Sequence, residues 1–165
     1  MQFFIVLLIA FGVGWVLPRR LGGRSVQDAM RRAMGVGLLF TGVSHIAMPD
    51  SFRVYFPSWV PFVDALVYAS GAIEMIGGLA LFGRRHRARV GLAVAAYFVL
   101  VFPANVYVAV AGVEESLPGL LDAPWYPWVR LPFQALFVWW ALRSTQTTTP
   151  VGRPSRALRL LGAAR

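Results

Sequence analysis

The sequence predicts an all-α membrane protein, and three observations carry that prediction. Of the 165 residues, 58% are hydrophobic and only 14% are charged, whereas a soluble domain carries about 25% charged residues. The hydrophobic residues gather into continuous blocks, most of them close to the roughly 20 residues that a helix needs to cross a bilayer. These blocks lack the alternating pattern of outer-membrane strands, which favours helices over a barrel.

Five blocks are long enough to serve as spanning helices. They cover residues 2–17, 30–48, 61–82, 90–111 and 126–143. The first and the last stand at the short end of the spanning range. The first block could instead be a signal peptide, but it has no basic start and no A-x-A cleavage site before the arginines that follow it. We therefore expect a retained anchor.

Arginine supplies all sixteen basic residues, and the chain has a net charge of +9. Most of the arginines lie outside the apolar blocks, in the segments 18–32 and 83–89 and in the tail that begins at residue 143. The positive-inside rule places these segments in the cytoplasm. Five crossings then give a multi-pass membrane protein with its N-terminus outside and its C-terminus in the cytoplasm. Because the charge follows the topology and suits anionic lipid headgroups, we expect no nucleic-acid partner.

These features divide the chain into three parts. Residues 1–29 form an N-terminal transmembrane anchor with a cytoplasmic Arg-rich loop, residues 30–143 a four-helix membrane domain, and residues 144–165 a basic cytoplasmic tail. The chain contains no cysteine, which excludes disulfides, thiolate catalysis and metal–thiolate sites within it.

Five strongly polar side chains interrupt the apolar blocks. They are His45, Glu74, Asn105, Arg130 and Gln134. Ionisable groups at membrane depth are costly, so they usually face the bundle interior and pair with one another. Helical spacing supports shared faces, because Thr41 precedes His45 by four residues, Ser70 precedes Glu74, and Arg130 precedes Gln134.

The direction of each span predicts that these side chains meet in the outer half of the bundle. Glu74 lies nearest the middle of its span and is expected at the floor of a polar, ligand-binding pocket. Pro103 is expected to bend its helix and to free the carbonyl near Val99, which neighbouring polar groups can satisfy. If Arg130 reaches Glu74 the pair is charged, and if it does not, burial leaves Glu74 neutral.

Other readings of the same residues stay open. Asn105 and Gln134 could serve only as structural contacts between helices. His45 could lie close enough to the interface to be solvated, and Arg130 could extend outward to water. The glycines of the spans are expected to allow close helix approach. They are Gly35, Gly37, Gly42, Gly71, Gly77 and Gly78.

Several segments resemble the DoxX family of small bacterial membrane proteins. They are GVSHIAMPDSF (42–52), FPSWVPF (56–62), YASGAIEMIGGLALF (68–82), VFPANVYVA (101–109) and WVRLPFQALFVWW (128–140). The resemblance covers about residues 30 to 143 and implies a four-helix core, with the first span as an addition. The five polar residues match the polar motifs of that family. Relatives are described as redox-associated or as membrane chaperones, and the absence of cysteine departs from any thiol-redox version.

These observations predict a binding or accessory protein whose pocket holds a lipid-soluble ligand, either a quinone or a lipid, or which supports a membrane complex. The alternatives are a quinone-linked oxidoreductase subunit and a small transporter or proton pathway, so catalysis stays open. The polar side chains are expected on only one side of the membrane midplane. This favours a binding site, because a conduction path would need polar side chains on both sides. We expect no metal and no resident cofactor apart from a quinone. Expected partners are the bilayer, a hydrophobic small molecule, and another membrane protein or a second copy of the chain.

Overall fold

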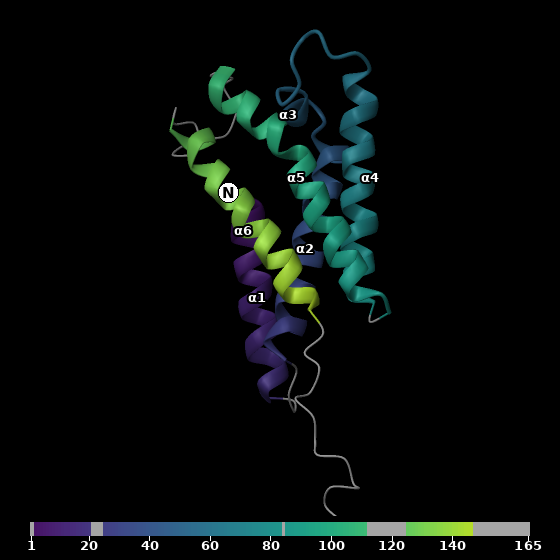
Figure 1. Cartoon of the computed structure of the whole chain (residues 1–165), viewed down its shortest axis with the longest axis vertical. Helices are drawn as coiled ribbons and strands as arrows, with labels where there is room; N and C mark the ends of the chain where they lie inside the picture. The colour runs from purple at the N-terminus through teal and green to yellow at the C-terminus, as the bar shows by residue number, and fades with distance from the viewer. Residues whose placement is uncertain (1, 21–24, 84, 112–124, 147–165) are drawn as a thin grey trace, which may run out of the picture.

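The computed structural model describes residues 2–20, 25–83, 85–111 and 125–146, and within them all regular elements are helices. Of residues 2 and 17–20 it describes the backbone only. The helices are α1 (Gln2–Arg20), α2 (Val26–Ala47), α3 (Asp50–Arg53), α4 (Val63–Phe82), α5 (Arg87–Ala111) and α6 (Tyr126–Thr145) (Figure 1). The predicted tail falls almost entirely outside the described residues.

The all-helical class is confirmed for the described part of the chain, and each of the five apolar blocks corresponds to a long helix. Two of these helices, α4 and α5, are long and apolar enough to cross a membrane by their length and composition. The apolar part of α1, Phe3–Val16, is shorter. The short helix α3 was not predicted, because its four residues lie in a segment expected to be a loop.

Helix α2 holds the centre of the fold, since it packs against α1, α4 and α6. Helix α5 packs mainly along α6 and touches α4 much less. The buried core draws on all five long helices, and α1 is part of it because its Leu7 is fully buried. Core members include Leu7, Met34, Leu38, Leu81, Phe98 and Trp140.

The closest helix contact joins α2 and α4 through two glycine pairs. A Cβ added to Gly35 would lie 2.9 Å from the Gly78 carbonyl oxygen, and one added to Gly42 would lie 2.8 Å from the Gly71 carbonyl oxygen. Contacts below 3.0 Å are not tolerated, so the two backbones touch where any side chain would separate them. The expected close approach is confirmed for these four glycines, which are seven residues apart on each helix.

Two other glycines behave differently. A Cβ on Gly37 would meet the ring of Phe3 at 2.7 Å, so Gly37 makes room for a side chain of α1. A Cβ on Gly77 would find its nearest neighbour, Val94 Cγ2, at 3.5 Å, which is ordinary van der Waals contact. The prediction that Gly77 allows close helix approach is therefore wrong, because its Cβ position lies nearest Val94 of α5 and comes no closer to α2 than 4.0 Å, at Leu38 Cδ1.

Arg31 corrects the predicted boundary of the first Arg-rich loop. Helix α2 begins at Val26, with the Ser25 side chain accepting a hydrogen bond from the backbone N–H of Asp28, so Arg31 is helical. Its side chain is only 1% exposed and donates to the carbonyl oxygens of Leu81 and Gly83. These carbonyls end α4 and lack helical partners, so Arg31 caps that helix. The prediction that Arg31 lies in the loop 18–32 is therefore wrong.

The opposite end of the bundle carries the connection from α3 to α4. Arg53 pairs with Asp50 and, at 2.6 Å, with Asp64, and the hydrogen bond to Asp64 raises the pKa of the Arg53 guanidinium. Phe62 precedes α4 with a left-handed φ of 56°. Residues with a Cβ rarely adopt this backbone conformation. The Phe62 ring itself is 84% exposed.

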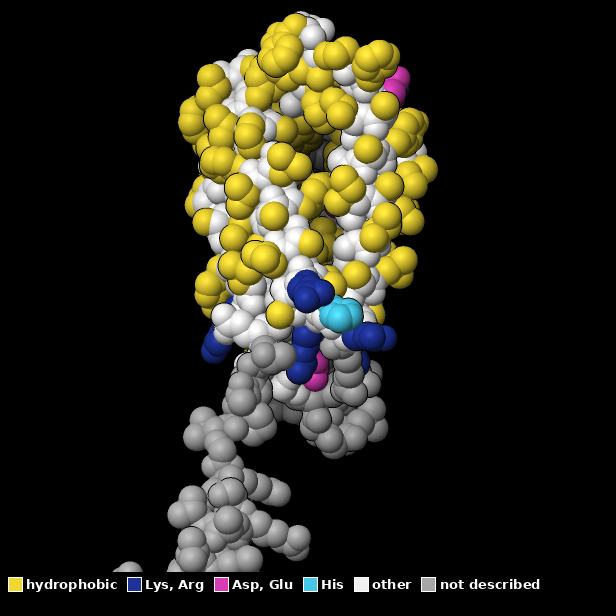
Figure 2. All heavy atoms as spheres, turned by 45° about the vertical axis from the view of Figure 1, so that its right-hand side comes forward, with side chains coloured by type: hydrophobic (Ala, Val, Ile, Leu, Met, Phe, Trp, Pro, Cys, Tyr) yellow, Lys and Arg dark blue, Asp and Glu magenta, His cyan; other side chains and the backbone are white. Residues whose placement is uncertain are grey.

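The outer surface of the bundle is mostly apolar. Figure 2 shows hydrophobic side chains over most of one face, with basic side chains gathered near its lower end and a hollow between the helices above them. Ile76 and Leu100 are among the most exposed large apolar residues, at 68% and 74%.

Replacing Gly42 by alanine tests the contact between α2 and α4. The new Cβ meets backbone atoms of α4, so Gly42→Ala should lower the free energy of unfolding by about 1–3 kcal/mol, which is typical of overpacking. Gly77→Ala is the matched control and should be neutral or stabilising by up to about 1 kcal/mol, because alanine has the higher helix propensity. Denaturation in detergent would measure the free energy of unfolding of both variants. Equal effects of the two substitutions would contradict the close contact between α2 and α4.

Replacing Arg31 by alanine tests its capping role. The carbonyls of Leu81 and Gly83 lose a charged donor, so Arg31→Ala should lower the free energy of unfolding by about 1.5–3 kcal/mol. Arg89→Ala, at an exposed position of α5, should change it by less than about 0.5 kcal/mol. Similar stability of the two variants would show that Arg31 acts only as a topological charge.

Candidate functional site

The candidate site is a cavity of about 190 Å³ between the helices. Its lining comes from all five long helices, from α3 and from the loop after α3. All five predicted site residues line it, namely His45, Glu74, Asn105, Arg130 and Gln134. The structure therefore brings these residues together, while their role in binding a ligand stays a prediction. Helix α1, expected as an addition to a four-helix core, closes one side with Phe3 and Phe4.

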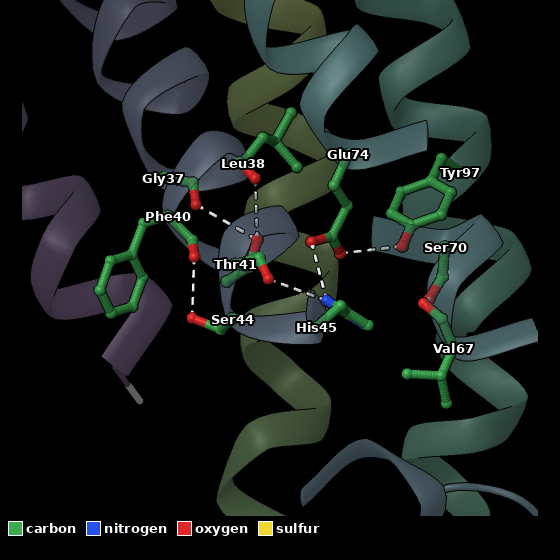
Figure 3. A network of polar contacts seen from close by, with 10 residues as sticks. All are labelled: Gly37, Leu38, Phe40, Thr41, Ser44, His45, Val67, Ser70, Glu74 and Tyr97. Atoms are coloured by element: carbon green, nitrogen blue, oxygen red, sulfur yellow. Dashed lines mark hydrogen bonds and ion pairs between the residues drawn. The ribbon is translucent and has the colours of Figure 1, made fainter. Parts of the chain in front are cut away.

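His45, Glu74 and Tyr97 form the first of two polar clusters (Figure 3). The Tyr97 hydroxyl donates to Glu74 Oε1 at 2.8 Å, and Glu74 Oε2 lies 3.5 Å from His45 Nδ1. His45 Nδ1 also lies 2.8 Å from the Thr41 carbonyl oxygen. Because a carbonyl only accepts hydrogen bonds, Nδ1 carries a hydrogen in this contact.

The second oxygen of Glu74 receives no hydrogen bond among the described residues, because His45 Nδ1, 3.5 Å away, donates its hydrogen to the Thr41 carbonyl oxygen. Glu74 is 9% exposed, and its Oε2 atom is buried. A buried polar atom without a partner is rare in folded proteins and calls for an explanation. Since Glu74 lines the cavity, a hydroxyl or amine of a bound molecule would satisfy this oxygen.

Asn105, Arg130 and Gln134 form the second polar cluster. Arg130 donates to Asn105 Oδ1, and Asn105 Nδ2 donates to Gln134 Oε1, both at 3.4 Å. The Arg130 guanidinium also lies 5.1 Å from the ring centroid of Tyr55, within the range of a cation–π contact. Arg130 is thus held against aromatic rings and an amide at the edge of the cavity.

The polar side chains also serve the backbone around Pro103. Gln134 donates to the carbonyl oxygen of Phe98, and Asn105 donates to that of Val101 at 3.4 Å. Pro103 lies inside α5, whose last turns lean toward α6 in Figure 1. These carbonyls are not the one that Pro103 frees, which belongs to Val99, so the expected bond between a polar side chain and the freed carbonyl stays a prediction.

Sequence reasoning missed Tyr97 and Phe52. Tyr97 precedes Val101 and Asn105 by four and eight residues, and all three line the cavity, so helical periodicity could have identified it. The Phe52 ring stacks on His45 with 3.6 Å between the centroids and 22° between the planes. Phe52 belongs to α3, and no periodicity connects that helix to α2.

The cavity offers two kinds of wall to a ligand. In the first polar cluster Glu74 Oε2 can accept a hydrogen bond, and in the second Arg130 and Asn105 carry donors. Aromatic rings such as Phe52 and Phe133 also line the cavity. Within the described ranges, no three His, Asp or Glu side chains group so as to hold a metal ion. A small head with oxygen donors and acceptors suits these walls.

The fold and the cavity define a helical-bundle protein with a polar pocket inside an apolar exterior. The chain belongs to the family described as a domain of unknown function, DUF8561, whose model matches residues 34–145. The match begins within α2, ends with α6 and contains all five predicted site residues, whereas α1 lies before it. No protein of curated function and no solved structure matches the chain. The resemblance to the DoxX family stays a prediction.

Proposed function

We propose that this protein is an integral membrane protein that binds a lipid-soluble ligand with an oxygen-bearing head, either a quinone or a lipid. The observation that carries the proposal is the polar cavity, in which the buried Glu74 Oε2 receives no hydrogen bond among the described residues. Such a group is costly in an apolar bundle. A ligand that donates to it would offset that cost.

The distribution of surface residues supports the membrane location. Along α4, the distance from Asp64 to the helix end at Gly83 is about 29 Å at 1.5 Å per residue, close to the thickness of a hydrocarbon core. Between those ends Glu74 is the one acidic or basic side chain of α4, and it lines the cavity. Contiguous exposed apolar surface marks a membrane or a partner interface, and Figure 2 shows it along most of the bundle.

The proposed topology has five crossings, by α1, α2, α4, α5 and α6, in the bacterial inner membrane. Helices α2, α4, α5 and α6 would form the DoxX-like four-helix bundle. The Arg-rich end would face the cytoplasm and the N-terminus the outside. Exposed aromatic residues at the opposite end support a membrane interface there, because such rings favour both interfaces of a bilayer. They are Trp59, Phe62, Trp125 and Trp128.

The contact between His45 and Glu74 favours a second candidate, a quinone-linked oxidoreductase subunit. These groups would exchange protons with the bound quinone, and a partner protein would supply the redox centre. A transporter has less support, because a second cavity on the cytoplasmic side of Glu74 is almost wholly apolar. A conduit would need polar groups on both sides of the midplane.

Single-cysteine labelling tests the topology, and the absence of native cysteine makes each label unambiguous. Ser58→Cys lies at the aromatic end and Ala88→Cys at the Arg-rich end, and both positions are exposed. An impermeant maleimide should label Ser58→Cys in intact spheroplasts, and Ala88→Cys only after permeabilisation. The reverse pattern would refute the orientation, and labelling of both in intact spheroplasts would refute the membrane location.

Mass spectrometry of co-purified organic molecules tests the ligand. The wild type in mild detergent should retain one quinone or lipid species, and the Glu74→Gln, His45→Ala double variant should lose most of it. Ser44→Ala is the matched control, because Ser44 adjoins His45 in sequence but is half-buried, lies outside the cavity lining and donates back to the Phe40 carbonyl. If all three proteins retain the same bulk lipid, His45 and Glu74 serve only as structural contacts between helices, and the proposal is wrong.

A further inference from the structure

A second cavity, of about 250 Å³, lies between α4 and α5. We call it the lateral crevice, and we define it by Ile76, Gly77 and Ala80 of α4 with Val90, Ala93 and Val94 of α5. It shares Glu74 and Tyr97 with the polar cavity, and these two residues are its only ionisable members. The hydrogen bond between them therefore lies where the two cavities meet.

Small side chains and sparse packing create the lateral crevice. Gly77, Ala80 and Ala93 place little volume between the two helices, and α4 makes far less contact with α5 than with α2. The missing Cβ of Gly77 would have no heavy atom closer than 3.5 Å. The same helix thus packs backbone to backbone on one face and leaves open space on the other.

The lateral crevice runs away from the polar cavity toward the Arg-rich end. From Glu74 to Ala80 it follows α4 for about 9 Å at 1.5 Å per residue. Ile76 and Ala93 on its borders are exposed, so it opens sideways at the surface. It is too small for a helix, whose diameter with side chains is about 10–12 Å. An apolar space of this shape fits a flexible hydrocarbon chain.

We infer that the lateral crevice takes the hydrocarbon chain of a single-chain amphiphile whose oxygen-bearing head lies in the polar cavity. This inference rests on the proposed function and adds the path of the chain. The head donates to Glu74 Oε2 and the chain leaves between α4 and α5, past the Tyr97 side chain. The ligand then enters and leaves from the lipid, with its head toward the outer side of the membrane.

Chain-length dependence of binding tests the inference in the full-length protein. The probes are p-benzoquinols, the reduced form of quinones, with a methyl or a decyl substituent, and 1-acylglycerols with a butanoyl or a dodecanoyl chain; the hydroxyls of both series can donate to Glu74. Ala93→Leu adds bulk inside the lateral crevice, and Ala96→Leu is the matched control on α5, because both positions are exposed and Ala96 lines neither cavity. Binding is measured at one detergent concentration, so that partition into micelles cancels between variants.

In the series that binds, the long-chain member should bind the wild type and Ala96→Leu more tightly than the short-chain member. Ala93→Leu should reduce that advantage by about tenfold, the loss expected from about two buried methylene groups. The series that binds also tells a quinone from a lipid. Photocrosslinking with a diazirine on the decyl chain should label the peptides 73–80 or 90–97, whereas labelling confined to 52–56 would overturn the inference.

The outcomes separate this inference from the proposed function. An unchanged long-chain advantage in Ala93→Leu, with binding still lost in the Glu74→Gln, His45→Ala variant, would overturn the chain path and keep the polar site. Absence of binding by either probe series to the wild type, together with no retained species by mass spectrometry, would overturn both.

Discussion

The backbone contact between α2 and α4 is the constraint on which the rest of the structure depends. Gly42 and Gly71 let the two helices touch, and a Cβ on Gly71 would lie only 2.7 Å from His45 Cβ. This closeness sets His45 against the next turn of α4, where Glu74 projects into the cavity. In the proposed membrane location helices gain little from the hydrophobic effect, so close backbone packing and buried hydrogen bonds would hold them together. Arg31 adds such bonds where α4 ends.

The two faces of α4 explain why there are two cavities of different character. Its glycine face meets α2 and carries the turn that presents Glu74, while its other face meets α5 loosely and stays apolar. Glu74 stands between them, bonded to Tyr97 and close to His45. An amphiphile also has one polar and one apolar part. The proposed ligand and the proposed path of its chain follow from that match.

Much of the site could be predicted because polar groups in apolar helices have few alternatives. His45, Glu74, Asn105, Arg130 and Gln134 each cost free energy against lipid, so they must face inward and meet one another. The errors arose where position along the chain does not reveal the neighbour. Arg31 looked like a loop charge, and nothing near it in sequence shows the free carbonyls of α4. Gly77 looked like its neighbour Gly78, although the two face different helices.

By itself, the sequence determined the helical class, the approximate extent of the long helices and the polar residues that converge. These features follow from composition and periodicity, which act within one helix. The tertiary structure alone decided that Glu74 bonds Tyr97, that Phe52 stacks on His45, and that α4 and α5 part to leave the lateral crevice. Those contacts join segments far apart in the chain, and their geometry depends on how deeply the side chains of two helices interlock.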